Sequence, residues 1–248
     1  MESNPYEAVN TTGQLPYARI APTPIQYMKQ SYGMIQGQYF LFFGITFCGL
    51  FLAGLAPMAI LLGPMLIGIY LCFLAREADR PVSFDLLFRG FDHFLPSLWV
   101  VLTMLLCNVV VTVLFLIIAV LFGFMFVSMM QGNGPQAFPA YLPFLAIGVG
   151  YCLLILCSIL SIVPFAFCFQ LIAEHQMSAS DAMKTSMRAV IHNAWPLALT
   201  YLSISFFGML AALFCYVPAF FLMPIQIGAT FVIYREIFPK NSNLHLAV

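Results

Sequence analysis

Four long stretches without Asp, Glu, Lys, Arg or His dominate the hydrophobic pattern of the chain. They are residues 39–75, 94–130, 138–172 and 195–234. A helix needs about 20 predominantly apolar residues to cross a bilayer. Each stretch is therefore long enough for one long span or two short ones.

Glycine and proline residues indicate how these stretches divide. Gly54 to Pro57 and Tyr216 to Pro218 are predicted to turn the first and last stretches into pairs of spans, because proline interrupts a helix. The two middle stretches are each interpreted as one long helix, since residues 112–115 contain no Gly or Pro, and Pro164 is expected to kink the second. The alternative is that each middle stretch holds two spans. A helix of about 35 residues exceeds a hydrocarbon core of about 30 Å and must tilt, kink or project.

The predicted fold is an all-α polytopic membrane helix bundle with six transmembrane helices arranged as three hairpins. Its domain covers residues 38–238, with spans at about 39–56, 58–76, 95–130, 138–173, 195–215 and 217–235. Residues 1–37 are polar and are predicted to be a disordered cytoplasmic tail rather than a cleaved signal peptide. Residues 239–248 are predicted to be a short cytoplasmic C-terminus.

Charge placement supports this topology. The chain is 62% hydrophobic and 7% charged, whereas about a quarter of the residues in soluble domains are charged. All nine basic and nine acidic residues lie in the tail, in residues 76–93 and 174–193, or after Tyr234. By the positive-inside rule that side is cytoplasmic, with both termini there. The net charge of zero argues against nucleic-acid binding.

Two cytoplasmic connections have the periodicity of amphipathic helices lying at the lipid headgroups. The first has an apolar face of Phe84, Leu87, Phe88, Phe91, Phe94 and Leu95 opposite Asp85, Arg89, Asp92 and His93. The second has a capping-box-like start at Ser178 and Asp181, then Met183, Met187, Val190 and Ile191 opposite Lys184, Arg188 and His192. The predicted interfacial residues are Asp85, Arg89, Trp99, Asp181, Arg188 and Trp195.

These two connections also resemble each other. Counting from Asp85 and from Asp181, a small residue follows after five positions and a tryptophan after fourteen. The even-numbered spans share a proline followed four residues later by a small residue: Pro64 and Gly68, Pro164 and Cys168, Pro224 and Gly228. One interpretation is internal duplication. The other is that small residues and prolines are frequent in transmembrane helices in any case.

Candidate chemistry is sparse. No metalloprotease, hydrolase or phosphate-binding motif occurs, and neither the seven cysteines nor the four histidines have ligand spacing, so we expect no enzyme activity, cofactor or metal. The polar or hinge positions predicted inside the spans are Asn108, Gln170, Gln226, Pro64, Pro164 and Pro224. Either the amides bond neighbouring helices together, or the proline-interrupted helices line a path for a neutral or amphiphilic solute.

Several short motifs resemble one group of bacterial six-helix membrane proteins. They are Gly63-Pro64 with Gly68 and Arg76, Ser83-x-Asp85 with Gly90-Phe91, Pro164, Ser180-Asp181-Ala182-Met183-Lys184-x-Ser186 with Asn193-x-Trp195, and Pro224 with Gly228 and Tyr234-Arg235-Glu236. The group comprises poorly characterised inner-membrane proteins and the membrane domain attached to some glycerophosphodiester phosphodiesterases. The resemblance covers residues 40–238, and it carries over no catalytic residue because the phosphodiesterase barrel is not in this sequence.

We therefore expect a non-enzymatic accessory or organising subunit of a bacterial-type inner membrane that binds other membrane components. Its expected partners are the lipid bilayer and a membrane protein or further copies of the chain. The alternative is a carrier or channel for a lipid or weakly charged solute.

Overall fold

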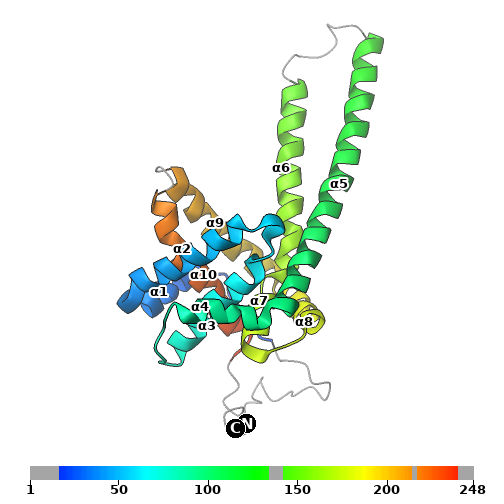
Figure 1. The fold of residues 1–248 in the computed structure, drawn as a ribbon. Coiled ribbons are helices and arrows are strands. Elements are labelled where there is room, and N and C mark those ends of the chain that lie inside the picture. Colours follow the sequence, from blue (N-terminus) through cyan, green and yellow to red (C-terminus); the bar gives the residue numbers. More distant parts are fainter. Residues whose placement is uncertain (1–16, 134–141, 214–216, 240–248) are drawn as a thin grey trace, which may run out of the picture. The chain divides into compact units, whose positions relative to one another are not determined.

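The computed structural model describes residues 17–133, 142–213 and 217–239 (Figure 1). All regular secondary structure in these ranges is helical, which confirms the all-α prediction. The chain forms two compact units, residues 1–101 with 166–248 and residues 102–165, and each is described by itself.

The larger unit contains most of the helices. They are α1 Pro24–Ile35, η1 Gln36–Gln38, α2 Tyr39–Leu55, η2 Pro57–Ala59, α3 Leu62–Glu77, α4 Asp85–Phe88, η3 Arg89–His93, the start of α5 Phe94–Asn133, α7 Cys168–His175, α8 Ala179–His192, α9 Ala194–Leu213 and α10 Val217–Ile237. The smaller unit consists of the rest of α5 with α6 Leu142–Ile162 and η4 Val163–Phe165.

Four helical stretches in the described residues are long and apolar enough to cross a bilayer. They are Pro24–Leu55, Asp85–Phe124, Ala194–Ala211 and Val217–Ile237. The chain is therefore an all-helical membrane protein, and the exact number of spans stays a prediction. The turn expected at residues 54–57 is present, because α2 ends at Leu55 and Ala56 is extended.

The expected second and fourth spans differ from the helices observed. The second helix, α3, begins at Leu62 because the 3-10 turn at Pro57–Ala59 precedes it. The expected fourth span is interrupted: α6 ends at Ile162, Pro164 lies in η4, and α7 begins only at Cys168. The proline thus ends one helix instead of kinking a continuous one, because it removes a backbone donor and clashes with the preceding turn.

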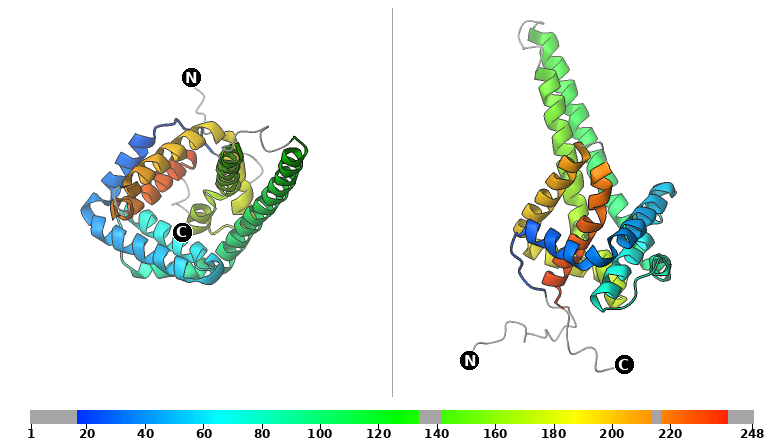
Figure 2. Two further views of the ribbon diagram at one scale, coloured as in Figure 1. Left: turned by 90° about the horizontal axis from the view of Figure 1, so that it is seen from above. Right: turned by 90° about the vertical axis from the view of Figure 1, so that its left-hand side faces the viewer.

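The prediction of a disordered tail through residue 37 is wrong for residues 24–35, which form α1. Pro24 stands in the first turn, where proline is well tolerated. Tyr27, Ser31 and Ile35 then recur every four residues and are buried. Ser31 faces α10, which α1 contacts, and the two helices cross in the right-hand view of Figure 2. The polar composition concealed this narrow buried stripe.

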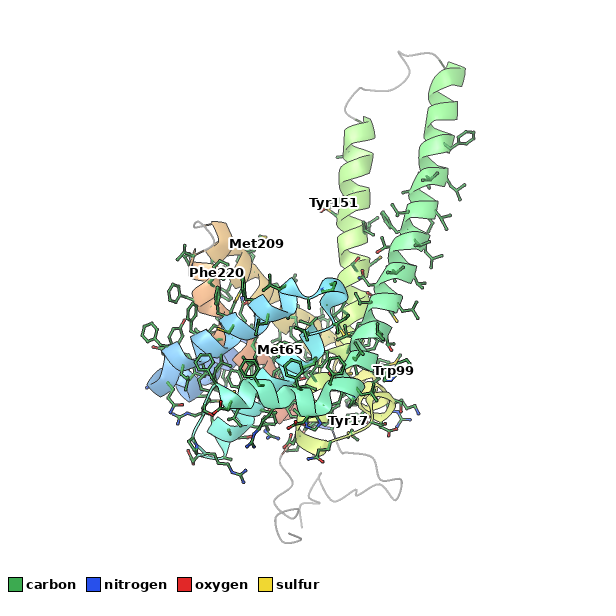
Figure 3. All side chains as sticks on the ribbon, in the orientation of Figure 1. Tyr17, Met65, Trp99, Tyr151, Met209 and Phe220 are labelled. Atoms are coloured by element: carbon green, nitrogen blue, oxygen red, sulfur yellow. The ribbon has the colours of Figure 1, made fainter. Side chains whose placement is uncertain are left out.

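The core of the larger unit is built on α3, which contacts α2, α4, η3 and α7. Met65 in the first turn of α3, labelled in Figure 3, is fully buried. A chain of aromatic rings continues the core toward α10: Phe42 lies 4.9 Å from Phe73, and Phe73 lies 5.6 Å from Phe231, centroid to centroid. Ring pairs at these separations add specific attraction to the apolar burial.

The smaller unit has little interior of its own. The most apolar window of the Asp85–Phe124 stretch has no buried residue. Within the unit, the amide nitrogen of Asn108 donates to the hydroxyl of Ser161 over 3.4 Å. The side chains of Val120, Phe122 and Phe124 are 69–74% exposed. This unit therefore presents apolar side chains outward along most of α5.

Candidate functional site

A cluster of charged residues joins the C-terminal ends of three helices in the larger unit. Arg235 on α10 donates from Nε and Nη2 to Glu77 on α3, over 2.8 and 2.6 Å. Its Nη1 donates to both carboxylate oxygens of Glu174 on α7, over 2.7 and 2.8 Å. The hydroxyl of Tyr234 donates to Glu174 over 2.6 Å. One guanidinium thus links three separate helices.

The surroundings of this cluster strengthen its ion pairs. The side chains of Arg235, Glu174 and Glu77 are only 14%, 18% and 26% exposed, so water screens them weakly. The Arg235 guanidinium also lies over the ring of Phe231, 5.3 Å from its centroid. His175 is 3.8 Å from Glu174, and burial is the largest effect on this imidazole, lowering its pKa despite the nearby carboxylate.

Sequence reasoning missed this cluster. The charge pattern places Arg76, Glu174 and Arg235 on the cytoplasmic side, each at the end of an even-numbered span, but it does not indicate which charged residues contact one another. Residues of opposite charge stand at the ends of the even-numbered spans, and this pattern could have indicated ion pairs between those helix ends. The fact that Glu77 rather than Arg76 joins the cluster depends on the rotation of α3, which no local pattern specifies.

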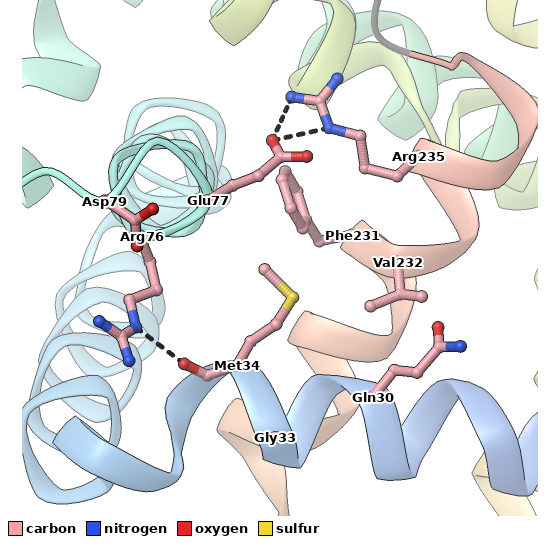
Figure 4. Close-up of a pocket in the computed structure, with 9 residues that line it drawn as sticks. All are labelled: Gln30, Gly33, Met34, Arg76, Glu77, Asp79, Phe231, Val232 and Arg235. Carbon is pink, nitrogen blue, oxygen red and sulfur yellow. Dashed lines mark hydrogen bonds and ion pairs between the residues drawn. The ribbon is translucent and has the colours of Figure 1, made fainter.

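A pocket of about 570 Å³ opens beside the cluster, between α1, α3 and α10 (Figure 4). It is lined by Gln30, Gly33, Met34, Arg76, Glu77, Asp79, Phe231, Val232 and Arg235. Arg76 donates from Nε to the carbonyl of Met34 over 2.9 Å and so caps the C-terminal end of α1. Asp79 has a positive φ of 53°, an uncommon conformation for a residue other than glycine.

The pocket combines an apolar wall with charges of both signs. Its volume falls within the roughly 300–1,000 Å³ usual for small-molecule sites. Met34, Phe231 and Val232 provide apolar surface, while Arg76 and Asp79 provide opposite charges. These groups suit a small ligand that is itself amphiphilic and carries both charges. Among the described residues, no group of three or more His, Cys, Asp or Glu side chains is placed to hold a metal ion.

The predicted intramembrane amides occupy three different settings. Asn108 lies in the smaller unit, bonded to Ser161. Gln170 on α7 is 1% exposed, and neither its amide oxygen nor its nitrogen has a hydrogen-bond partner in the part of the chain described. Gln226 on α10 lies against α9, where a methyl group at Gly208 would come within 2.6 Å of its amide nitrogen. The last contact fits the interpretation that these amides join helices.

The three predicted hinge prolines also differ in their surroundings. Pro64 and Pro224 are buried in the larger unit, and Pro164 lies in η4. Near Pro224, the hydroxyl of Ser31 donates to the carbonyl of Ile225 over 2.8 Å, and the hydroxyl of Tyr39 donates to the carbonyl of Phe221. Side-chain donors of this kind satisfy carbonyls near a proline where water is absent.

All six residues predicted to be interfacial are exposed: Asp85, Arg89, Trp99, Asp181, Arg188 and Trp195. Trp99, labelled in Figure 3, is 58% exposed, and Trp195 is 74% exposed. The predicted start of α8 is present, because the hydroxyl of Ser178 accepts from the backbone N–H of Asp181 over 3.3 Å. It also donates to the Asp181 carboxylate over 2.6 Å.

The predicted apolar faces of the two connections need correction. In each connection, some of the apolar side chains are buried against the protein and the others are exposed. Leu87 is fully buried, whereas Phe88 is 51% exposed. On α8, Val190 is 5% exposed, whereas Met187 and Ile191 are 50% and 64% exposed. Each connection therefore packs a narrow side of small or apolar residues on the core and leaves a second apolar side outward.

No family model, curated protein or solved structure matches the chain. The resemblance to bacterial six-helix membrane proteins therefore stays a prediction from the sequence, and the function is argued from the geometry.

Proposed function

We propose that the protein is a non-enzymatic accessory or organising subunit of a bacterial inner membrane, with both termini in the cytoplasm. In this proposal it binds a membrane-protein partner, or further copies of itself, through the smaller unit. The observation that carries the proposal is the exposed apolar surface of α5.

The length of α5 is the first part of the argument. Its 40 residues, without one charged side chain, extend about 60 Å at a rise of 1.5 Å per residue. A hydrocarbon core of about 30 Å would cover the whole helix only at a tilt near 60°, while transmembrane helices tilt by about 20° on average. Lipid alone therefore leaves part of this helix uncovered.

The side chains on α5 indicate what would cover that part. Leu121, Phe122 and Phe124 are 60–74% exposed, so burying them against another apolar surface is favourable. Exposed apolar side chains that lie together on one surface often mark an interaction site. A partner protein with its own apolar helices would provide the cover that a bilayer of ordinary thickness does not.

Photocrosslinking in the native membrane tests this proposal. A benzophenone amino acid would replace Phe122 near the far end of α5, or Phe40 in the first turn of α2, as a control with similar exposure of 80%. We expect a protein adduct of defined mass at Phe122 and only lipid adducts at Phe40. Lipid adducts alone at both positions would refute docking through the smaller unit.

A carrier or channel for a lipid or weakly charged solute is the second candidate. It is favoured by the pocket beside the charged cluster, which joins apolar wall and opposite charges. Reconstituted protein should then move an amphiphilic solute between the two sides of a vesicle. Replacing Gln226 or Asn108 by Leu should reduce that flux, and unchanged flux in both variants would count against transport through the helices that hold these amides.

A further inference from the structure

Two surface segments contact the core through matching small residues. Gly90 in η3 packs against α3 so closely that a methyl group there would lie 1.9 Å from the carbonyl oxygen of Pro64. A methyl group on Gly68 would lie 1.9 Å from the carbonyl oxygen of Leu87. Pro64 and Gly68 on α3 thus form the surface against which the segment α4–η3 packs.

The second contact repeats this arrangement on α7. Ser186 of α8, which matches Gly90 in sequence, accepts a hydrogen bond from the backbone N–H of Phe167 over 3.2 Å. Phe167 directly precedes Cys168, the residue that stands four positions after Pro164 as Gly68 stands after Pro64. The surface helix α8 therefore also contacts the preceding hairpin next to its small residue, Cys168.

The surface segment that packs near the third proline, Pro224, is α1. The residue seated against Gly228 is Ser31 of α1, and a methyl group on Gly228 would lie 2.2 Å from its hydroxyl. The same hydroxyl donates to the carbonyl of Ile225 over 2.8 Å. Ser31 thus occupies the place of Gly90 and Ser186, and α1 is a third surface helix.

Aligning the chain on these three small residues reveals shared exposed positions. One residue later stand Tyr32, Phe91 and Met187, which are 49%, 40% and 50% exposed. Nine residues later stand Phe40, Trp99 and Trp195, which are 80%, 58% and 74% exposed. In each case a large apolar side chain points outward at the beginning of a long apolar helix, namely α2, α5 or α9.

The contacts also follow one rule of connectivity. The segment α4–η3 packs on α3 and the helix α8 packs on α7, so each surface segment contacts the helix that precedes it in the chain. Helix α1, the first described surface helix, packs on α10, the last described helix. The three contacts therefore close into a cycle, which chance similarity between membrane helices does not explain.

We propose that the chain contains three copies of one unit, a surface helix followed by a membrane hairpin, and that all three surface helices bind the phospholipid headgroup layer of one leaflet. The exposed aromatic and methionine side chains would enter the lipid, as is typical of interfacial helices. The exposed cations Lys29, Arg89 and Lys184 would lie among the phosphates. This inference is independent of docking through the smaller unit.

Depth-dependent fluorescence quenching tests the proposal on the full chain in phosphatidylcholine–phosphatidylglycerol vesicles. Three proteins with a single tryptophan would be compared: one retaining Trp99, one retaining Trp195, and one with Phe40→Trp after both native tryptophans are changed to Phe. Bromine atoms would be placed near either end of the acyl chains. We expect all three proteins to be quenched more strongly by the shallow bromines than by the deep ones.

The control is Phe206→Trp in the same background, because Phe206 is 53% exposed and lies 11 residues after Trp195 on α9. That separation is about 16 Å along a helix, so its tryptophan should be quenched more by the deep bromines. If Phe40→Trp, at the start of α2, does not fold, Tyr32→Trp on α1 replaces it as the reporter. The proposal would be overturned if the tryptophan at position 40 or 32 were quenched like that of Phe206→Trp, or not at all.

Discussion

Individual small residues determine how closely the helices of the larger unit approach. Gly68→Ala would place a methyl group against the backbone of Leu87, which cannot rotate away as a side chain can. Inserting a methyl group into a closely packed interior costs about 1–3 kcal/mol, and we expect this variant at the upper end. The measurement is the midpoint of thermal unfolding in a mild detergent.

Gly33→Ala is the matched control for that substitution. Gly33 also lies within a helix, but a methyl group there would meet no atom within 4 Å. Because alanine favours helix over glycine by about 1 kcal/mol, this variant should be as stable as the parent or slightly more stable. Equal losses in both variants would show that the close approach of α3 to Leu87 is not what makes Gly68 necessary.

Arg235 is the residue whose loss should destabilise the charged cluster most. Arg235→Leu would leave the carboxylates of Glu77 and Glu174 without their shared cation, and breaking a buried ion pair costs on the order of 3 kcal/mol. Thermal unfolding in a mild detergent at neutral pH measures the loss.

Glu174→Gln is the control for Arg235→Leu, because it retains a hydrogen-bond acceptor for Tyr234 and leaves Arg235 paired with Glu77. It should cost clearly less than Arg235→Leu at neutral pH. If the two variants lose the same stability, the cluster acts through shape and not through charge. The ionisable residues of the cluster can be identified from the sequence. Their ion pairs cannot be predicted from it, because they depend on how the ends of three helices pack together.

At the scale of elements, the sequence predicts where a helix ends when a single glycine or proline ends it. The turn after Leu55 was predicted from Gly54 and Pro57, and the disturbance at Pro164 was predicted in position though not in extent. Helix α1 was missed for a different reason. A 12-residue helix is marginal by itself in water, so its formation depends on α10, about 200 positions away in the sequence.

Substitutions on the two sides of α1 test that dependence. Ser31→Leu would insert a large side chain between α1 and Gly228 and remove the hydrogen bond to Ile225. We expect it to lower stability by roughly 2–3 kcal/mol through overpacking. The neighbouring Tyr32→Leu changes a side chain that is 49% exposed and should change stability by less than about 0.5 kcal/mol.

Proteolysis gives the same comparison a structural readout. If Ser31→Leu releases α1 from α10, a protease should cut near Lys29 sooner in that variant than in Tyr32→Leu. If the two variants are cut at the same rate and are equally stable, the folding of α1 does not depend on its packing against α10.

At the scale of the whole molecule, composition was sufficient to predict a helical membrane protein, because so much apolar surface cannot be hidden from water in a soluble fold. The number of spans depends on finer features. Helices α1 and α2 join through η1 into one stretch of 32 residues, whereas α3 has only 16 residues. A count based on uncharged stretches cannot distinguish a surface helix from the start of a span.

The sidedness of the charged connections is the whole-molecule prediction that follows from the charge pattern. In the inner-membrane topology proposed above, and in a background without the seven native cysteines, Arg80→Cys and Arg188→Cys should react with a membrane-impermeant maleimide only after that membrane is opened. Pro57→Cys, at the exposed turn after α2, should react in intact spheroplasts. The reason is that basic residues are retained on the cytoplasmic side during insertion. Positions 80 and 188 flank the long helices, so labelling from opposite sides would require an odd number of spans between them and would exclude the six-span topology.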